Sequence, residues 1–392
     1  MAARIMLPGR AEPLEVTAPG WAPGYPPPVS RRVYAAAHVA SVDGGDIIDW
    51  EATLGFRDHL WAHGFAVAEA MDTAQRGMGL SWWLARELIA SSAERAAARR
   101  AAGRYADLAC GAGTDHLAAT EAHSITKITD AYSVQLEFVQ SAGAGVILMA
   151  SRALAAAARG PRDYLDVYGE LLKQASRPVI LHWLGEAFDP ALRGYWGGAD
   201  FESAAATVLE LIDRAGDKVD GVKLSVLDAD KEIALRRRLP AGVRLYTGDD
   251  FGYADLIKGS DPDHGVPSHG DRGDHDHSDA LLGAFAAVTA PAAAALHALD
   301  AGDLAGYDAA IGPTVSLSRL IFEEPTYYYK TGVAFLAWLN GLQPRFLMLD
   351  GLEHRRSAAH LTRVFELAAA AGALADPDLA VGRMAAYLKE HA

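Results

Sequence analysis

The sequence predicts an α/β fold, a (β/α)8 TIM barrel that carries an N-terminal hairpin and arm and a C-terminal helical appendage. The prediction depends on a regular alternation of short apolar runs with longer stretches of helical period. The runs lack the polar alternation of a half-exposed strand, which is typical of parallel strands buried on both faces. Eight of them fall within about 255 residues, the number and spacing of this barrel. They are Val33–Ala40, Phe65–Ala70, Tyr105–Cys110, Gly145–Ala150, Pro178–Trp183, Gly221–Ser225, Val243–Thr247 and Ala280–Phe285.

A doubly wound open sheet is the alternative arrangement of such strands. It usually has a glycine-rich turn after its first strand. Here Val33–Ala40 is followed by Ser41-Val-Asp-Gly-Gly45 instead, which favours the barrel. Helical patterns separate the strands and then continue after the last one. They are Trp82–Arg100, Thr120–Ser141, Asp163–Ala175, Phe201–Ala215, Pro291–Asp300, Leu304–Leu320, Thr331–Asn340, Ser357–Ala371 and Leu379–Glu390.

The first thirty residues differ from the rest. The two apolar stretches Arg4–Leu7 and Leu14–Val16, separated by Pro8-Gly9, predict a small hairpin. The four prolines in residues 21–30 predict an extended arm. We therefore expect three segments: residues 1–31 as hairpin and arm, residues 32–290 as the barrel, and residues 291–392 as helices packed on it.

Composition limits the class of protein. The chain has 392 residues, a net charge of −14 and 51% hydrophobic residues, enough for a large core. The single cysteine, Cys110, which we expect to be buried, excludes an intramolecular disulfide. We expect no membrane span, because no uncharged apolar run reaches about 18 residues. The acidic balance argues against nucleic acid. Met1–Arg10 shows no secretory signal, so we expect a cytoplasmic protein.

Function in such a barrel collects where the strands end. The sixth expected strand contains Lys223 within the apolar run Gly221–Ser225. A lysine that faces the barrel interior loses solvation, which makes its neutral amine available for Schiff-base chemistry. The other interpretation is a lysine that points outward between helices.

Several motifs together resemble the N-acetylneuraminate lyase and dihydrodipicolinate synthase superfamily, over about residues 32–340. The segment Asp43-Gly-Gly-Asp-Ile-Ile-Asp-Trp-Glu51 is similar to the turn and helix start after that family's first strand. The resemblance continues in four further motifs and weakly in Thr326–Gly332. These motifs are Leu80-Ser-Trp-Trp-Leu-Ala-Arg-Glu87, Ala109-Cys-Gly-Ala-Gly-Thr114, Gly221-Val-Lys-Leu-Ser225 and Tyr246-Thr-Gly-Asp-Asp250. The resemblance implies a class I lyase in which Lys223 forms the Schiff base and no cofactor takes part.

Two departures from the family pattern mark a divergent branch. The family's Gly-Thr-Thr-Gly-Glu turn, which holds a substrate carboxylate, corresponds here to Asp72-Thr-Ala-Gln-Arg-Gly77. The fourth strand ends Met149-Ala-Ser-Arg-Ala153, without the tyrosine that moves the proton in that family. These changes put pyruvate-type substrates in doubt and suggest a keto-sugar or a larger oxo-acid.

His182, at the end of the fifth strand, is our candidate to move the proton, because an imidazole titrates near neutral pH. A core histidine bonded to a backbone carbonyl is the other interpretation. We expect further groups at the mouth of the barrel to bind substrate, with helix caps and rim ion pairs as their alternative roles. They are Thr73, Arg76, Ser151, Arg152, Asp249 and Asp250.

Two other classes of function stay open. A metal-dependent isomerase or hydrolase would need converging ligands, available from Glu69, Asp72, Asp115, His116, His182 and Asp249. A barrel without catalytic activity could bind a small molecule. The His- and Asp-rich stretch of residues 259–277 is expected to be a solvated loop that binds no metal. The other interpretation is a zinc or manganese site, because histidine and carboxylate side chains bind these ions. We also expect a homo-oligomer, a dimer or tetramer, with Tyr327–Tyr329, Phe335 and Trp338 as aromatic surface. The other interpretation is that these aromatics pack on the barrel itself.

Overall fold

The computed structural model describes residues 2–71, 75–118, 121–259 and 276–391. Eight parallel strands close into a barrel in the order β10-β3-β4-β5-β6-β7-β8-β9. This confirms the (β/α)8 prediction. The barrel strands are β3 (Val33–Ala36), β4 (Ala66–Glu69), β5 (Leu108–Ala112), β6 (Gly145–Leu148), β7 (Val179–Leu184), β8 (Val219–Ser225), β9 (Arg244–Thr247) and β10 (Asp279–Leu282).

Helices follow the strands, as expected for this fold. The first eight are α1 (Trp50–Ala62), α2 (Trp82–Ala101), α3 (Ile125–Ser141), α4 (Arg152–Ala157), α5 (Pro161–Gln174), α6 (Phe201–Ala215), α7 (Ala229–Arg236) and α8 (Tyr253–Lys258). The last six are α9 (Ala284–Ala287), α10 (Thr289–Asp300), α11 (Leu304–Ile321), α12 (Lys330–Leu339), α13 (Ala358–Ala370) and α14 (Pro377–Glu390). Short 3-10 helices include η1 (Pro190–Leu192) and η2 (Tyr195–Gly197).

Several boundaries differ from those expected; for example, the strand expected over Val33–Ala40 ends at Ala36, and the one expected over Tyr105–Cys110 spans Leu108–Ala112. The helix expected from Thr120 begins at Ile125, because the Ser124 side chain caps its first turn by accepting from the Lys127 amide. The last strand ends at Leu282, and Phe285, expected in that strand, lies in the short helix α9.

The described chain divides into two compact units, each of which we treat separately. The first comprises residues 1–67, 103–107 and 283–392, and the second comprises residues 68–102 and 108–282. These boundaries differ from those of the three predicted segments, and the division into residues 1–31, 32–290 and 291–392 stays a prediction.

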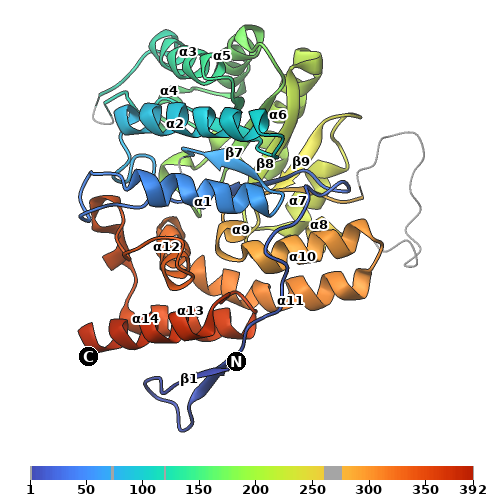
Figure 1. Ribbon diagram of the computed structural model, residues 1–392. Coiled ribbons are helices and arrows are strands. Elements are labelled where there is room, and N and C mark those ends of the chain that lie inside the picture. The colour runs from blue at the N-terminus through green and yellow to red at the C-terminus, as the bar shows by residue number, and fades with distance from the viewer. Residues whose placement is uncertain (1, 72–74, 119–120, 260–275, 392) are drawn as a thin grey trace. The chain divides into compact units, whose positions relative to one another are not determined.

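The first unit contains the predicted N-terminal hairpin and the C-terminal helices. Strands β1 (Ala3–Ile5) and β2 (Leu14–Val16) pair antiparallel, which confirms the hairpin, and residues 21–30 form no helix or strand. Helices α10, α11 and α13 pack against one another in succession (Figure 1). Tyr329 and Phe335 are buried within this unit, against Phe322 and Phe346. The prediction that these two aromatics form exposed surface was therefore wrong, because apolar rings of the same chain cover them.

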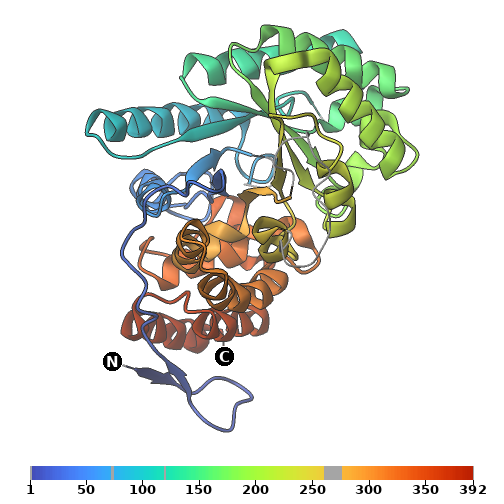
Figure 2. The same cartoon turned by 90° about the vertical axis from the view of Figure 1, so that its right-hand side faces the viewer.

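The second unit contains strands β5 to β10 with the helices α2 to α8, which lie around the strands (Figure 2). Their parallel register places His182 of β7 beside Lys223 of β8, and Lys223 beside Tyr246 of β9. Gly221 permits the close approach of β8 and β9 because it has no side chain. A Cβ at this position would come within 2.6 Å of the Arg244 carbonyl oxygen and 2.7 Å of the Tyr246 ring. Cys110 is fully buried in β5, as expected.

Candidate functional site

Neighbouring side chains show which face of β7, β8 and β9 points into the barrel. Thr247 donates from Oγ1 to the carboxyl group of Glu232 on helix α7, at 3.0 Å. Trp183 stacks on Phe201 of helix α6, with ring centroids 5.0 Å apart. Both side chains therefore point outward, toward the helix layer. Because successive side chains of a strand point to opposite faces, their neighbours Tyr246 and His182 point inward, and so does Lys223, their register partner.

Lys223 and His182 occupy equivalent positions in adjacent strands. Each lies two residues before the last residue of its strand, Leu184 in β7 and Ser225 in β8. Both are buried, with 4% and 0% of their surfaces exposed. Burial, and then the positive charge of Lys223, lower the pKa of His182 well below its usual value. The imidazole is therefore neutral at physiological pH. Its Nε2 lies 3.4 Å from Ser225 Oγ, on the same inward face.

A cavity of about 550 Å³ opens at the carboxyl ends of β5 and β6. Its wall includes residues 113–115 after β5, residues 149–153 after β6, and Arg76. Thr114 and Ser151 are buried there, with their hydroxyl oxygens 2.6 Å apart. Ser151 also caps helix α4, because its Oγ accepts from the Leu154 amide. Lys223 and His182 are not among the residues that line this cavity.

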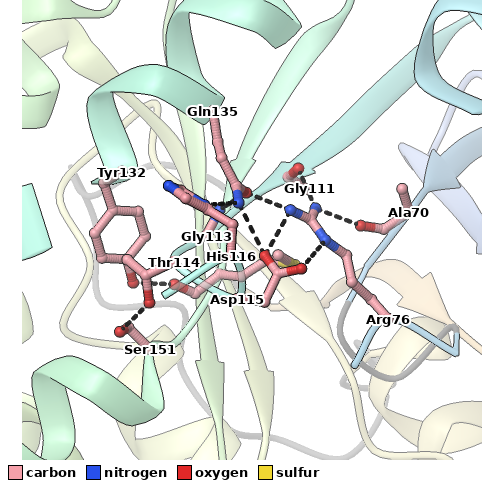
Figure 3. Close-up of polar contacts among 11 residues, drawn as sticks. Ala70, Arg76, Gly111, Gly113, Thr114, Asp115, His116, Tyr132, Gln135 and Ser151 are labelled. Carbon is pink, nitrogen blue, oxygen red and sulfur yellow. Dashed lines mark hydrogen bonds and ion pairs between the residues drawn. The ribbon is translucent and has the colours of Figure 1, made fainter. Parts of the chain in front are cut away.

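Arg76 is buried and anchors one side of the cavity (Figure 3). Its Nε and Nη2 donate to the two carboxylate oxygens of Asp115, at 3.1 and 2.7 Å. Its Nη1 donates to the carbonyl oxygens of Ala70 and Gly111, and Nη2 donates also to Gln135 Oε1. A guanidinium has five N–H donors, so all of them are used within the protein.

Gln135 of helix α3 completes this network, as Figure 3 shows. Its Oε1 accepts from Arg76 and from the Gly113 amide, and its Nε2 donates to Asp115 Oδ1 at 2.9 Å and to His116 Nδ1 at 2.8 Å. In its neutral form His116 therefore carries its proton on Nε2. Burial raises the pKa of Asp115, but the charge and hydrogen bonds of Arg76 and those of Gln135 outweigh it, so that the pKa lies below its usual value. The sequence analysis missed Gln135, which has the spacing of an ordinary core position of its helix.

Three tyrosines lie behind the end of β6, the strand that in this chain does not end in a tyrosine. Tyr132 of α3 donates to the Met149 carbonyl, and the hydroxyl oxygens of Tyr168 and Tyr195 are 2.9 Å apart. The Ser151 amide donates to the Tyr195 hydroxyl at 2.9 Å. Burial raises the pKa of all three phenols well above the usual value. They come from α3, α5 and η2, so that only the folded chain brings them together.

The other predicted substrate-binding residues have diverse positions. Arg152 lies at the cavity wall with 59% of its side chain exposed, and its Nε donates to Asp189 at 2.5 Å. Asp249 is buried, and its Oδ1 accepts from the amides of Phe251 and Gly252. Asp250 is also buried. Thr73 lies outside the described residues, as does Asp72.

The alternative metal-binding set does not assemble in the part of the chain that the structure describes: no group of three or more His, Cys, Asp or Glu side chains there could hold a metal ion. Glu69 accepts from Ser92 of helix α2, at 2.7 Å, and so points to the helix layer. Most of the His- and Asp-rich stretch, residues 260–275, lies outside the described residues. Ser278 at its end is buried and donates to Glu232 at 2.7 Å.

Solved structures share this fold. The barrel is similar to dihydrodipicolinate synthase from Aquifex aeolicus, with a TM-score of 0.63 and 13% identity over 86% of this chain and 97% of that one. The enzyme from Cyanidioschyzon merolae with lysine bound has a TM-score of 0.63 and 15% identity, over 88% and 99% of the two chains. A putative dihydrodipicolinate synthetase from Pseudomonas aeruginosa has a TM-score of 0.59 and 16% identity, over 86% and 99%.

Sequence comparison assigns the chain to a family. No curated protein matches this sequence. Among the described residues, no helix has the length and apolar character needed to cross a membrane. A family model described as "Protein of unknown function (DUF993)" matches residues 9–392, nearly the whole chain. The chain therefore belongs to the DUF993 family, whose barrel here has the fold of the dihydrodipicolinate synthases.

Proposed function

We propose that this protein is a class I lyase that forms a Schiff base through Lys223 and cleaves a carbon–carbon or carbon–oxygen bond of a keto-sugar. The observation that carries the proposal is the inward position of a buried lysine, Lys223, directly beside the buried His182 of the neighbouring strand. The similarity to dihydrodipicolinate synthases supports the same class of chemistry, and the residues of this chain supply the argument for it.

The proposed reaction begins with attack of the Lys223 amine on the substrate ketone. Loss of water gives an iminium, which withdraws electrons from the adjacent carbon. In carbon–carbon cleavage, His182, or a water that it holds, takes the proton of the substrate hydroxyl. The breaking bond then leaves its electron pair in an enamine. Protonation of the enamine and addition of water release the second product and restore the amine. The iminium supplies the electron withdrawal, so the proposal requires no cofactor.

Although Lys223 does not line it, we propose that the cavity after β5 and β6 holds the part of the substrate remote from the ketone, and its groups favour a keto-sugar over an oxo-acid. A buried cation with free donors would favour a carboxylate, but the five donors of Arg76 are all used within the protein. Arg152 is exposed at the wall and paired with Asp189, so it would meet only an anionic group at the rim. Thr114 and Ser151 offer hydroxyl groups, which suit the hydroxyls of a sugar. In this proposal Arg76 positions Asp115 and does not bind substrate itself.

The test is reductive trapping. The protein is treated with borohydride in the presence of a panel of keto-sugars and oxo-acids, and the adduct is located by peptide mass spectrometry. We expect an adduct on Lys223 with keto-sugars and none with the Lys223→Met variant. The matched control is Lys231→Met, because Lys231 is half-exposed on helix α7 and should leave trapping unchanged. A folded protein that gives no adduct at Lys223 across the panel would contradict the proposal.

A further inference from the structure

A second cavity, of about 530 Å³, lies entirely within the first unit. Four separate parts of the chain form its wall besides the proline-rich arm. The wall consists of residues 18–23 at the start of the arm, His59 of helix α1 with its C-cap residue His63, residues 286–291, the end of helix α12 with Asn340 and Leu342, and the residues Gly372, Ala373 and Ala375. No residue of the candidate active site contributes to it.

The wall is mostly apolar, and hydrogen bonds join its parts. Trp21 of the arm donates from Nε1 to the Gly372 carbonyl at 2.8 Å. Asn340 donates from Nδ2 to the Ala373 carbonyl at 2.9 Å and accepts from the Ala375 amide at 2.8 Å. The Thr289 hydroxyl donates to the Phe285 carbonyl at 2.9 Å. The arm is thus bonded to the end of α13, and these polar side chains already have partners within the protein.

Two histidines provide the remaining polar groups of the wall. His59 and His63 are one helical turn apart on α1, with ring centroids 4.4 Å apart. His63 Nδ1 lies 2.8 Å from the His59 carbonyl oxygen and must donate to it, which leaves Nε2 as a hydrogen-bond acceptor in the neutral ring. The described residues offer no hydrogen bond to the ring nitrogens of His59.

Both imidazoles are neutral at physiological pH. Burial, and then the neighbouring His63, lower the pKa of His59 to about 3. Burial likewise lowers the pKa of His63, against the opposing effect of its hydrogen bond to the His59 carbonyl. No lysine or arginine is among the lining residues of this cavity. The two neutral histidines therefore offer hydrogen bonds to a ligand, but the wall has no positive charge to balance the negative charge of an anion. This disfavours an anionic ligand.

We propose that this cavity is a binding site for a neutral, mainly apolar small molecule with one hydrogen-bonding group, such as a phenol or an aromatic amine. Ligand sites are mostly apolar cavities of about 300–1,000 Å³ with a few well-placed polar groups, and this cavity has those properties. The apolar body of the ligand lies between the arm and helices α10 and α12, and its polar group meets His59 and His63. The site is separate from the proposed lyase chemistry.

The experiment uses N-phenyl-1-naphthylamine, a neutral probe with a single N–H group whose fluorescence rises in apolar surroundings. We expect saturable binding to the full-length protein. Ala22→Trp fills the cavity from the exposed arm, and Ala290→Phe fills it from the start of helix α10. Each should weaken binding at least tenfold. His59→Phe keeps the ring volume but loses the hydrogen bonds, and should weaken binding about three- to tenfold.

Matched controls distinguish this cavity from other apolar surface. His354→Phe changes an exposed histidine outside the wall and should leave binding unchanged. The anionic probe 8-anilinonaphthalene-1-sulfonate should bind more weakly than the neutral one. Circular dichroism and thermal unfolding check that each variant is folded. Binding that is not saturable, or that both filling variants leave unchanged while folded, would overturn the proposal. Trapping at Lys223 should not change in any of these variants.

Discussion

Arg76, Asp115 and Gln135 form a buried network in which nearly every polar atom has a defined partner. Gln135 alone joins four groups, since it accepts from Arg76 and the Gly113 amide and donates to Asp115 and His116. A buried donor that loses its partner loses solvation without compensation. We therefore regard this network as the rigid support of the cavity wall.

Replacing Gln135 with leucine tests this role. The change keeps the side-chain volume close to that of glutamine but leaves the Gly113 amide and one Arg76 donor without a partner. We expect the free energy of unfolding to fall by roughly 2–4 kcal/mol, measured by urea denaturation. The control is Gln174→Leu at the end of helix α5, where the exposed Gln174 side chain donates to Glu170. Equal stability of the two variants would contradict the role of Gln135.

The predicted borohydride adduct on Lys223 also depends on a single residue. Its chemistry depends on one amine in a desolvated position, and the matched Lys231 variant separates that amine from lysines in general. His182 depends on the same geometry, because the strand register keeps the two side chains adjacent.

At the scale of elements, helix α7 and strand β9 join through a buried carboxyl group. Glu232 accepts from Ser278 at 2.7 Å and from Thr247 at 3.0 Å. Burial raises its pKa to about 8; the Ser278 and Thr247 hydrogen bonds and Arg236 oppose this, while Asp249 adds to it. Glu232 is therefore mainly protonated in the folded protein at neutral pH.

This raised pKa predicts a pH dependence of stability. The pKa of Glu232 is near 4.3 in the unfolded state and about 8 in the folded state. Between these two pH values only the folded protein keeps the proton on Glu232, so the free energy of unfolding falls as the pH rises through this range. Glu232→Gln imitates the protonated form and should remove this dependence. At pH 8 we expect the free energy of unfolding of this variant to exceed that of the wild type by an amount on the order of a few kcal/mol. At pH 5 the two free energies of unfolding should differ little. Urea denaturation at both pH values, with the exposed Glu202→Gln as control, measures this. The same pH dependence in Glu232→Gln as in the wild type would contradict it.

Close packing of strands β8 and β9 gives another prediction. Gly221→Ala would place a Cβ 2.6 Å from the Arg244 carbonyl oxygen, where backbone must move. We expect a loss of roughly 1–3 kcal/mol in the free energy of unfolding. Gly169→Ala, in helix α5 with no atom within 4 Å of the new Cβ, should instead gain about 0.5–1 kcal/mol through helix propensity. A shared direction of change in the two variants would refute this packing argument.

At the scale of the whole molecule, we expect a homo-oligomer, a dimer or tetramer. Trp83 of helix α2 is 71% exposed and Val134 of helix α3 is 54% exposed, although most large apolar side chains of the described chain are buried. Such side chains are frequent in subunit contacts. Light scattering after size exclusion should give a mass of two or four times 41.6 kDa. Trp83→Lys should lower it, with the mostly exposed Lys173→Ala on helix α5 as control. A mass of 41.6 kDa for the wild type would contradict this expectation.

The sequence by itself determined the barrel, the hairpin and the C-terminal helices. Periodicity is a local property: apolar runs without alternation mark strands covered on both sides, and runs such as Phe201–Ala215 mark helices whose bounds the structure reproduces. The position of Lys223 within the strand Val219–Ser225 was also visible, because a charged residue interrupts an apolar run.

Only the tertiary structure decided what these residues meet. The inward direction of Lys223 depends on its register with His182 and Tyr246. The use of every Arg76 donor depends on Gln135, which lies 59 residues away along the chain. The wall of the second cavity comes from distant segments, two of which are joined where Trp21 donates to a carbonyl 351 residues away. Hydrogen bonding acts over about 3 Å in space, whereas a sequence pattern records only neighbours along the chain. The chemistry of each site therefore became defined when distant segments came together.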